Sequence, residues 1–226
     1  MTQWSIFTPI IFRMMERRYV EQFFATGELM ISSFDRFSKH KDEQRKDVEG
    51  QNIICGRGSK ATVFAVTGHG SDAFVLCGSA ANDPQLMDAF ACDAAIQIYD
   101  PTGFASVVTR HLPGVRQGFE GFCYYKDGSI ECNIGDFELD QLKTQAGDNL
   151  DLGRLGGFVL NMAGLAVFFR KAMRFRHQAE YRWVWITDHS VSESIVIHVP
   201  EARSFCAPFF ANEAGGAEPS VGADSR

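Results

Sequence analysis

The side chains best placed to do chemistry are an acid and a guanidinium two residues apart, Glu180 and Arg182, in the segment AEYRWVWI at 179–186. On a β-strand alternate side chains face opposite ways, so these two share one face. Three aromatic side chains then form an apolar wall on the other face: Tyr181, Trp183 and Trp185. The segment is either a rigid charged pair used in chemistry or a half-buried strand with a salt-bridged outer face.

Arg13 is a second charged residue in an apolar setting, because it follows Ile10–Phe12 and precedes two methionines. Burying an unpaired guanidinium is costly, so we expect Arg13 to find an anion. One alternative is an internal salt bridge to Glu49 or Glu180. The other is a clamp on a diphosphate, since a guanidinium matches phosphate oxygens in bidentate geometry.

A dense charged loop is predicted over Ser38–Asn52, with Arg45, Asp47 and Glu49 at its centre. It is either a solvated loop or a lid that folds over a cleft. A basic cluster of Arg170, Lys171, Arg174 and Arg176 ends a predicted long helix. These cations either compensate the dipole of the helix or meet a phosphate-rich partner.

Several common kinds of chemistry find no support in the sequence. The segment GRGSK at 56–60 is not a P-loop, because a predicted strand follows it rather than a helix. There is no GxSxG, HExxH or helix-opening GxGxxG motif. The six His and six Cys residues lack metal-ligand spacing, so no metal is expected, and the cysteines are predicted to be reduced and structural, as in the cytosol.

The composition fits a globular protein with an aromatic-rich interior, with 45% hydrophobic residues and 20 Phe among 226. The net charge of −6 excludes a generally basic surface that coats nucleic acid and leaves only a local basic patch for that purpose. The longest apolar stretch, Phe158–Phe169, is too short to span a bilayer. We therefore expect a cytoplasmic protein with no membrane partner and no N-terminal signal.

Local patterns predict one α+β domain over residues 1–210, with a mixed, mainly antiparallel sheet and flanking helices, and a disordered tail over 211–226. Gly27 is expected to end a helix over Glu16–Thr26, and an Asn or Asp before a Pro caps two later helices. The other predicted helix is 155–175. The predicted strands are 10–14, 29–33, 52–56, 61–67, 73–78 and 94–99, with hairpins formed by 120–126 with 129–134 and by 180–187 with 194–199.

Five segments taken together resemble a bacterial family of unknown function that occurs in phage-defence and abortive-infection settings. In chain order they are FR, TGELMISSF, DEQRKDVEG, FVLCGSAANDPQLMDAFACDAAIQIYD and HQAEYRWVW. The resemblance spans about residues 12–200. It implies a toxin or an antiviral defence effector, and a cognate antitoxin as a partner.

The same layout is similar to that of ADP-ribosyltransferases, including toxins that modify DNA. Those enzymes place an Arg or His on the first strand, a Ser or aromatic residue mid-chain and a Glu on a late strand. The resemblance implies that Arg13 and Glu180 are catalytic. It further implies a set of residues that bind NAD, the substrate that acts as cofactor: Arg13, Ser79, Phe90, Tyr99 and Arg182.

The expected function is therefore NAD-dependent ADP-ribosyl transfer, a glycosyltransferase reaction, to nucleic acid, a nucleotide or a protein. Cleaving the nicotinamide–ribose bond passes through an oxocarbenium-like state, which a fixed carboxylate stabilises without a metal. Hydrolysis of NAD by water is a weaker alternative. A non-catalytic module that binds a nucleotide or a partner protein, such as an antitoxin or sensor, is the alternative from another class. A Glu180 sealed by Arg182 in a dry core would favour that module.

Overall fold

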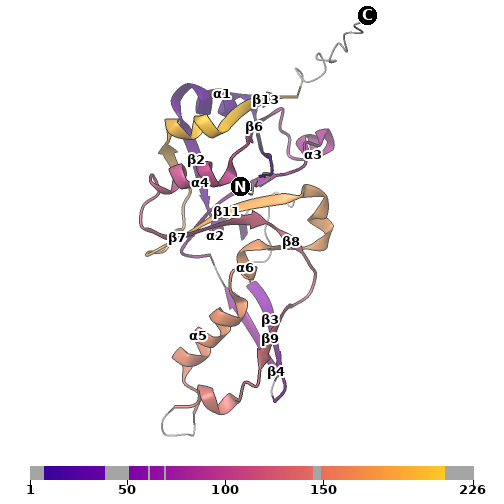
Figure 1. The fold of residues 1–226 in the computed structure, drawn as a ribbon, viewed down its shortest axis with the longest axis vertical. Helices are drawn as coiled ribbons and strands as arrows, with labels where there is room; N and C mark the ends of the chain where they lie inside the picture. Colours follow the sequence, from indigo (N-terminus) through magenta and orange to yellow (C-terminus); the bar gives the residue numbers. More distant parts are fainter. Residues whose placement is uncertain (1–7, 39–50, 61, 69, 145–148, 212–226) are drawn as a thin grey trace, which may run out of the picture. The chain divides into compact units, whose positions relative to one another are not determined.

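The computed structural model describes residues 8–38, 51–60, 62–68, 70–144 and 149–211 (Figure 1). The chain forms two units, each built from separate stretches. The first comprises Met1–Leu29, Cys77–Leu112 and Val196–Arg226, and the second Met30–Leu76 and Pro113–Ile195. Three strands contain a point where the chain passes between the units: β2 (Glu28–Ser33), β5 (Ala73–Ser79) and β12 (Ile195–His198).

The first unit is built on antiparallel strands in the order β1 (Ile11–Met15), β6 (Ala94–Ile98) and β13 (Cys206–Phe210). The end of β5 pairs with β1, where Phe12 lies opposite Ser79. Helix α1 (Arg17–Thr26) packs on β6 and β13 (Figure 1). The unit also contains α3 (Pro84–Ala89), α4 (Pro101–Thr109) and the 3-10 helix η3 (Pro200–Phe205).

Helix α1 illustrates how local sequence sets an element. Val20 and Phe23 lie three residues apart and form its buried stripe. Gly27 adopts φ +83° after the last turn, and its N–H donates to the carbonyl of Phe23 at 2.8 Å. A glycine in this left-handed conformation ends the helix as the sequence predicted.

In the second unit, β11 (Glu180–Thr187) pairs antiparallel with β7 (Val115–Phe122) and also pairs with β5. Part of β5 also pairs with β2, where Val75 lies opposite Ser32. Seven of the eight residues of β11 are buried, with only Ile186 half-buried. The prediction of a half-buried strand is therefore wrong, because both faces of β11 lie in the interior. A hairpin of 180–187 with 194–199 is also wrong, since the neighbours of β11 are β7 and β5.

A separate three-stranded sheet in the second unit has the order β4 (Thr62–Gly68), β3 (Gln51–Gly58) and β9 (Ile130–Gly135). Helix α5 (Leu152–Ala163) lies along β3 and β9, as Figure 1 shows. Side chains of the sheet, α5 and α6 (Ala166–Phe169) form a small core around Ile54, Ile130 and Val167. The helices α2 (Phe34–Ser38) and η1 (Leu139–Leu142) also belong to this unit.

The predicted hairpin of 120–126 with 129–134 does not form, because its strands have other partners. Strand β9 pairs parallel with β3, while the two-residue strand β8 (Tyr124–Tyr125) pairs parallel with β10 (Arg170–Lys171). The guanidinium of Arg170 donates to the carbonyls of Lys126 at 3.1 Å and Gly128 at 2.5 Å. A side chain therefore uses the acceptors at the turn that would have joined the two strands.

The coarse fold class is confirmed: the chain is α+β, with a mainly antiparallel multi-stranded sheet and several helices. The predicted helix over 155–175 is interrupted, because α5 and α6 give way to β10 and the 3-10 helix η2 (Met173–Gln178).

Within the described ranges, no helix is both long and apolar enough to cross a bilayer. One domain over 1–210 stays a prediction, and residues 212–226 of the predicted tail lie outside the described residues.

Gly27 and Gly128 form a matched pair for testing how tightly α1 is held. Both have φ near +80°, where a Cβ costs about 1–2 kcal/mol. A Cβ on Gly27 would lie 2.6 Å from backbone atoms of Pro200, whereas one on Gly128 meets nothing within 4 Å. We expect Gly27→Ala to lower the free energy of unfolding clearly more than Gly128→Ala in urea titrations. Equal losses would mean that the Pro200 backbone moves aside freely.

Candidate functional site

A buried carboxylate with two cations lies in the interior of the second unit. Arg182 Nε donates to Glu180 Oε1 at 2.5 Å, and Lys171 Nζ forms an ion pair with Glu180 Oε2. The three side chains are only 9% (Glu180), 7% (Lys171) and 3% (Arg182) exposed. Each carboxylate oxygen therefore has its own cation inside the protein.

Neighbouring groups complete the hydrogen bonds of this ion cluster. Lys171 also donates to Gln178 Oε1 at 2.5 Å, and Arg182 Nη1 donates to the carbonyl of Phe168 at 2.7 Å. The thiol of Cys123 lies 3.7 Å from Glu180 Oε1, and the backbone N–H of Glu180 donates to the hydroxyl of Tyr125 at 2.7 Å. Such saturation is what makes a buried charge tolerable.

The electrostatics keep Glu180 ionised. Burial by itself raises the pKa of its carboxyl group, but the charges and hydrogen bonds of Arg182 and Lys171 outweigh burial and lower the pKa to about 2. Burial raises the pKa of Tyr125 to about 12, so its hydroxyl stays neutral beside the cluster. Two cations already balance the charge of this carboxylate. It would therefore stabilise a positive charge that develops on a substrate only weakly.

The chain around η2 brings the cluster together. Strand β10 carries Lys171, η2 ends with Gln178, and Ala179 turns the chain into β11 with φ +40°, a conformation rare for alanine. Within β11, Glu180 and Arg182 lie on one face, as the sequence predicted. Lys171 was not predicted as a partner of Glu180, because it lies nine positions earlier and irregular chain separates the two. Gln178 was not predicted either, because the turn at Ala179 interrupts the strand period between it and Glu180.

Three of the predicted residues of the first unit form hydrogen bonds to backbone groups of that unit. Arg13 Nη1 donates to the carbonyl of Cys77 at 3.0 Å. Ser79 Oγ accepts from the N–H of Ala81 at 2.9 Å, and the Tyr99 hydroxyl donates to the carbonyl of Ser204 at 2.8 Å. Phe90 caps the C-terminal end of α3, directly after its last residue, and is half-buried.

The structure thus brings together some of the predicted site residues. Arg13 and Ser79 lie on the neighbouring strands β1 and β5 of the first unit. Glu180 and Arg182 form an ion pair in the second unit. The loop residues Arg45, Asp47 and Glu49 lie outside the described residues.

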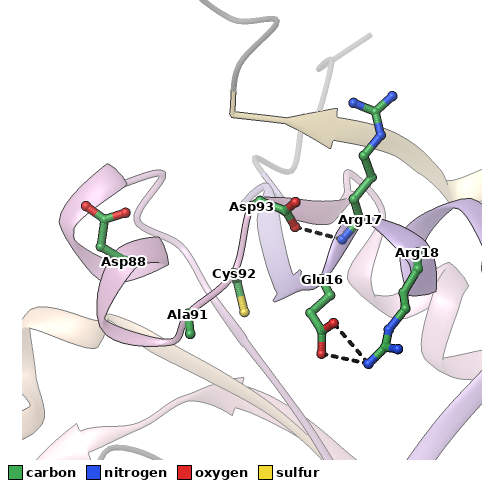
Figure 2. A pocket seen from close by; sticks show the side chains of 7 residues that line it. All are labelled: Glu16, Arg17, Arg18, Asp88, Ala91, Cys92 and Asp93. Atoms are coloured by element: carbon green, nitrogen blue, oxygen red, sulfur yellow. Dashed lines mark hydrogen bonds and ion pairs between the residues drawn. The ribbon is translucent and has the colours of Figure 1, made fainter.

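The first unit also contains an open hollow of about 640 Å³ that involves none of the predicted residues. It is lined by charged side chains of both signs and by two small uncharged ones: Glu16, Arg17, Arg18, Asp88, Ala91, Cys92 and Asp93. Figure 2 shows that Glu16 pairs with Arg18, while Asp93 accepts from the backbone N–H of Arg17 at 2.7 Å. The Arg17 guanidinium lies over the Phe210 ring at 4.3 Å. The hollow thus carries both charges, and most of its charged groups already have partners within the protein, which gives no sign of a particular ligand.

Metal chemistry finds no ligand set in the part of the chain that the structure describes, where no three His, Cys, Asp or Glu side chains are grouped to hold an ion. The six cysteines are free thiols. Comparisons of this chain with protein-family models, with curated proteins and with solved structures gave no match. The geometry of the chain itself is therefore the basis for any functional argument.

Glu180→Gln tests whether the ion cluster holds the fold. The change leaves two buried cations without their counter-charge, so we expect the free energy of unfolding at pH 7 to fall by about 3–5 kcal/mol. The control is Glu131→Gln, which breaks an ion pair with Arg57 whose side chains are 39% and 66% exposed. Solvent screens that pair, so the control should lose far less. Equal losses by chemical denaturation would contradict the structural role.

The pH dependence gives an independent test of the same cluster. The pKa of Glu180 is about 2 in the folded protein and about 4.5 when unperturbed, so its stabilisation is complete above about pH 5 and is lost as pH falls toward 2. This titration amounts to about 3 kcal/mol. Wild-type stability should therefore fall more steeply below pH 5 than that of Glu180→Gln. Parallel curves would show that Glu180 does not titrate between the two states.

Proposed function

We propose that this chain is a non-catalytic binding module rather than an enzyme. The observation that carries the proposal is the state of Glu180, whose two carboxylate oxygens are each engaged by a buried cation. A catalytic carboxylate in glycosyl transfer must face the substrate and stabilise charge that develops there. Glu180 instead stabilises Lys171 and Arg182, and freeing it would take away the carboxylate that both buried cations contact.

ADP-ribosyl transfer is the competing proposal, and the order of residues along the strands supports it. Arg13 lies on β1, Ser79 ends β5 and Glu180 begins β11, the layout that an ADP-ribosyltransferase-like fold would require. In that case NAD is the substrate and a toxin or defence role follows. A cytoplasmic location fits both proposals and stays a prediction.

Nicotinamide release separates the two proposals. The full chain is incubated with NAD alone, with single-stranded DNA, with nucleotides and with a cell extract as protein source, and free nicotinamide is measured by chromatography. We expect no release above that of heat-unfolded protein under any of these conditions. Release by the wild type that a folded Arg13→Lys variant reduces would overturn the binding-module proposal, because Lys keeps the charge but loses the bidentate fork.

A further inference from the structure

The charge of this chain is distributed unevenly around η2. From residue 152 to residue 179 there is no Asp or Glu, while five cations occur: Arg154, Arg170, Lys171, Arg174 and Arg176. The rest of the chain carries 17 cations against 28 acids. A cationic segment in an acidic protein marks a local site of opposite potential, which attracts anions that the remaining surface repels.

Three of these five cations have partners within the chain, and the other two are exposed; Arg154 pairs with Asp151 at 3.5 Å. Arg170 binds the carbonyls of Lys126 and Gly128, and Lys171 belongs to the ion cluster of Glu180. Arg174 and Arg176 are exposed on η2 and have no carboxylate partner among the described residues. The guanidinium of Arg174 lies over the ring of Phe175 at 4.7 Å, which holds it in place and leaves its N–H donors for another acceptor.

The chain from the end of β7 through β8 presents a second exposed feature. Its side chains alternate: Cys123 and Tyr125 point to the ion cluster, where they contact Glu180. Phe122, Tyr124 and Lys126 are exposed, with 52% of Phe122 and 37% of Tyr124 accessible to solvent. Phe122 is the last residue of β7, and its ring packs edge-to-face against Tyr181 at 5.1 Å between centroids while part of it stays exposed. Tyr124 and Lys126 follow at two-residue intervals, so the spacing favours a common outward direction for these three side chains.

Backbone contacts place η2 beside this segment. Strand β8 pairs with β10, directly before η2, and the N–H of Lys126 donates to the carbonyl of Lys171 at 3.0 Å. Where η2 begins, the N–H of Met173 donates to Asp127 Oδ1 at 3.0 Å. All these residues belong to the second unit. We call the β8–η2 surface the side chains of Phe122, Tyr124, Lys126, Arg174 and Arg176.

We propose that the β8–η2 surface binds single-stranded nucleic acid. Guanidinium and ammonium groups pair with phosphates, and exposed aromatic rings stack on unpaired bases, the two contacts that single-strand binders combine. An acidic protein would use the cations without stacking on the rings, and a membrane surface would insert the rings rather than stack on them. The inference rests on the proposed binding function and names its ligand class.

The test measures binding of fluorescently labelled dT20 and rU20 to the full chain by anisotropy over a range of salt concentrations. Arg174→Gln with Arg176→Gln should raise the dissociation constant at 100 mM salt by at least about tenfold and reduce the slope of log K against log salt by about 1.4. The matched control, Arg18→Gln with Arg110→Gln, removes the same charge from exposed positions of the first unit. It should change the dissociation constant less than about twofold.

Phe122→Leu tests stacking, because leucine keeps apolar bulk and loses the aromatic face. It should weaken oligonucleotide binding about tenfold and leave binding of heparin, an anion without bases, unchanged. Melting curves establish that each variant is folded. The proposal is overturned by equal losses in the two arginine pairs, by tighter binding of a 20-base-pair duplex than of dT20 or rU20, or by a Phe122→Leu variant that binds both single strands normally.

Failure of this proposal is distinct from failure of the proposed function. Nicotinamide release together with loss of oligonucleotide binding in the Arg174 and Arg176 variant would remove the non-catalytic proposal and keep the binding surface. Wild-type protein that binds neither dT20 nor rU20 at 50 mM salt, but sediments with anionic phospholipid vesicles, would overturn the nucleic-acid assignment alone.

Discussion

The second unit depends on neutralising one buried carboxylate. Glu180 is ionised inside the protein only because Lys171 and Arg182 are held against it, and each of these cations needs a carbonyl or amide oxygen in turn. These hydrogen bonds and ion pairs fix the paths of three segments at once, because β10 supplies Lys171, η2 supplies Gln178 and β11 supplies Glu180 and Arg182. Removing one member would leave charge buried without compensation, so the cluster acts as a constraint on the fold.

The same constraint explains why the cationic segment divides into an inner and an outer set. To deliver Lys171 and Gln178 to Glu180, the chain leaves α6, forms two residues of strand and turns through η2. This short path cannot bury every side chain, and Arg174 and Arg176 remain on its outer side. Exposed arginines suited to binding phosphates thus lie close in the chain to the buried ion cluster. The two features need not share a function.

Local signals in the sequence predicted local structure well. Asp83 and Asp100 cap their helices, each with Pro at the next position, and Gly27 ends α1. Features set by distant contacts were missed, since the partner of β9 is β3 and Lys171 meets Glu180 through an irregular turn. Caps and turns depend on a few adjacent residues, whereas strand partners and ion clusters depend on how the whole chain packs, which no short period encodes.

Arg13 and Arg182 show why a charged residue in an apolar strand is an ambiguous sign of function. Both stand between apolar neighbours in the sequence, and an anion was expected for Arg13. In the structure a backbone carbonyl accepts from each of them, that of Cys77 for Arg13 and that of Phe168 for Arg182. Arg170 and Arg203 bind carbonyls in the same way. A guanidinium has five donors, and carbonyls that sheet and helix bonds leave available can satisfy several of them. An arginine between apolar neighbours in this chain therefore points first to acceptors within the protein, and by itself it does not identify a ligand.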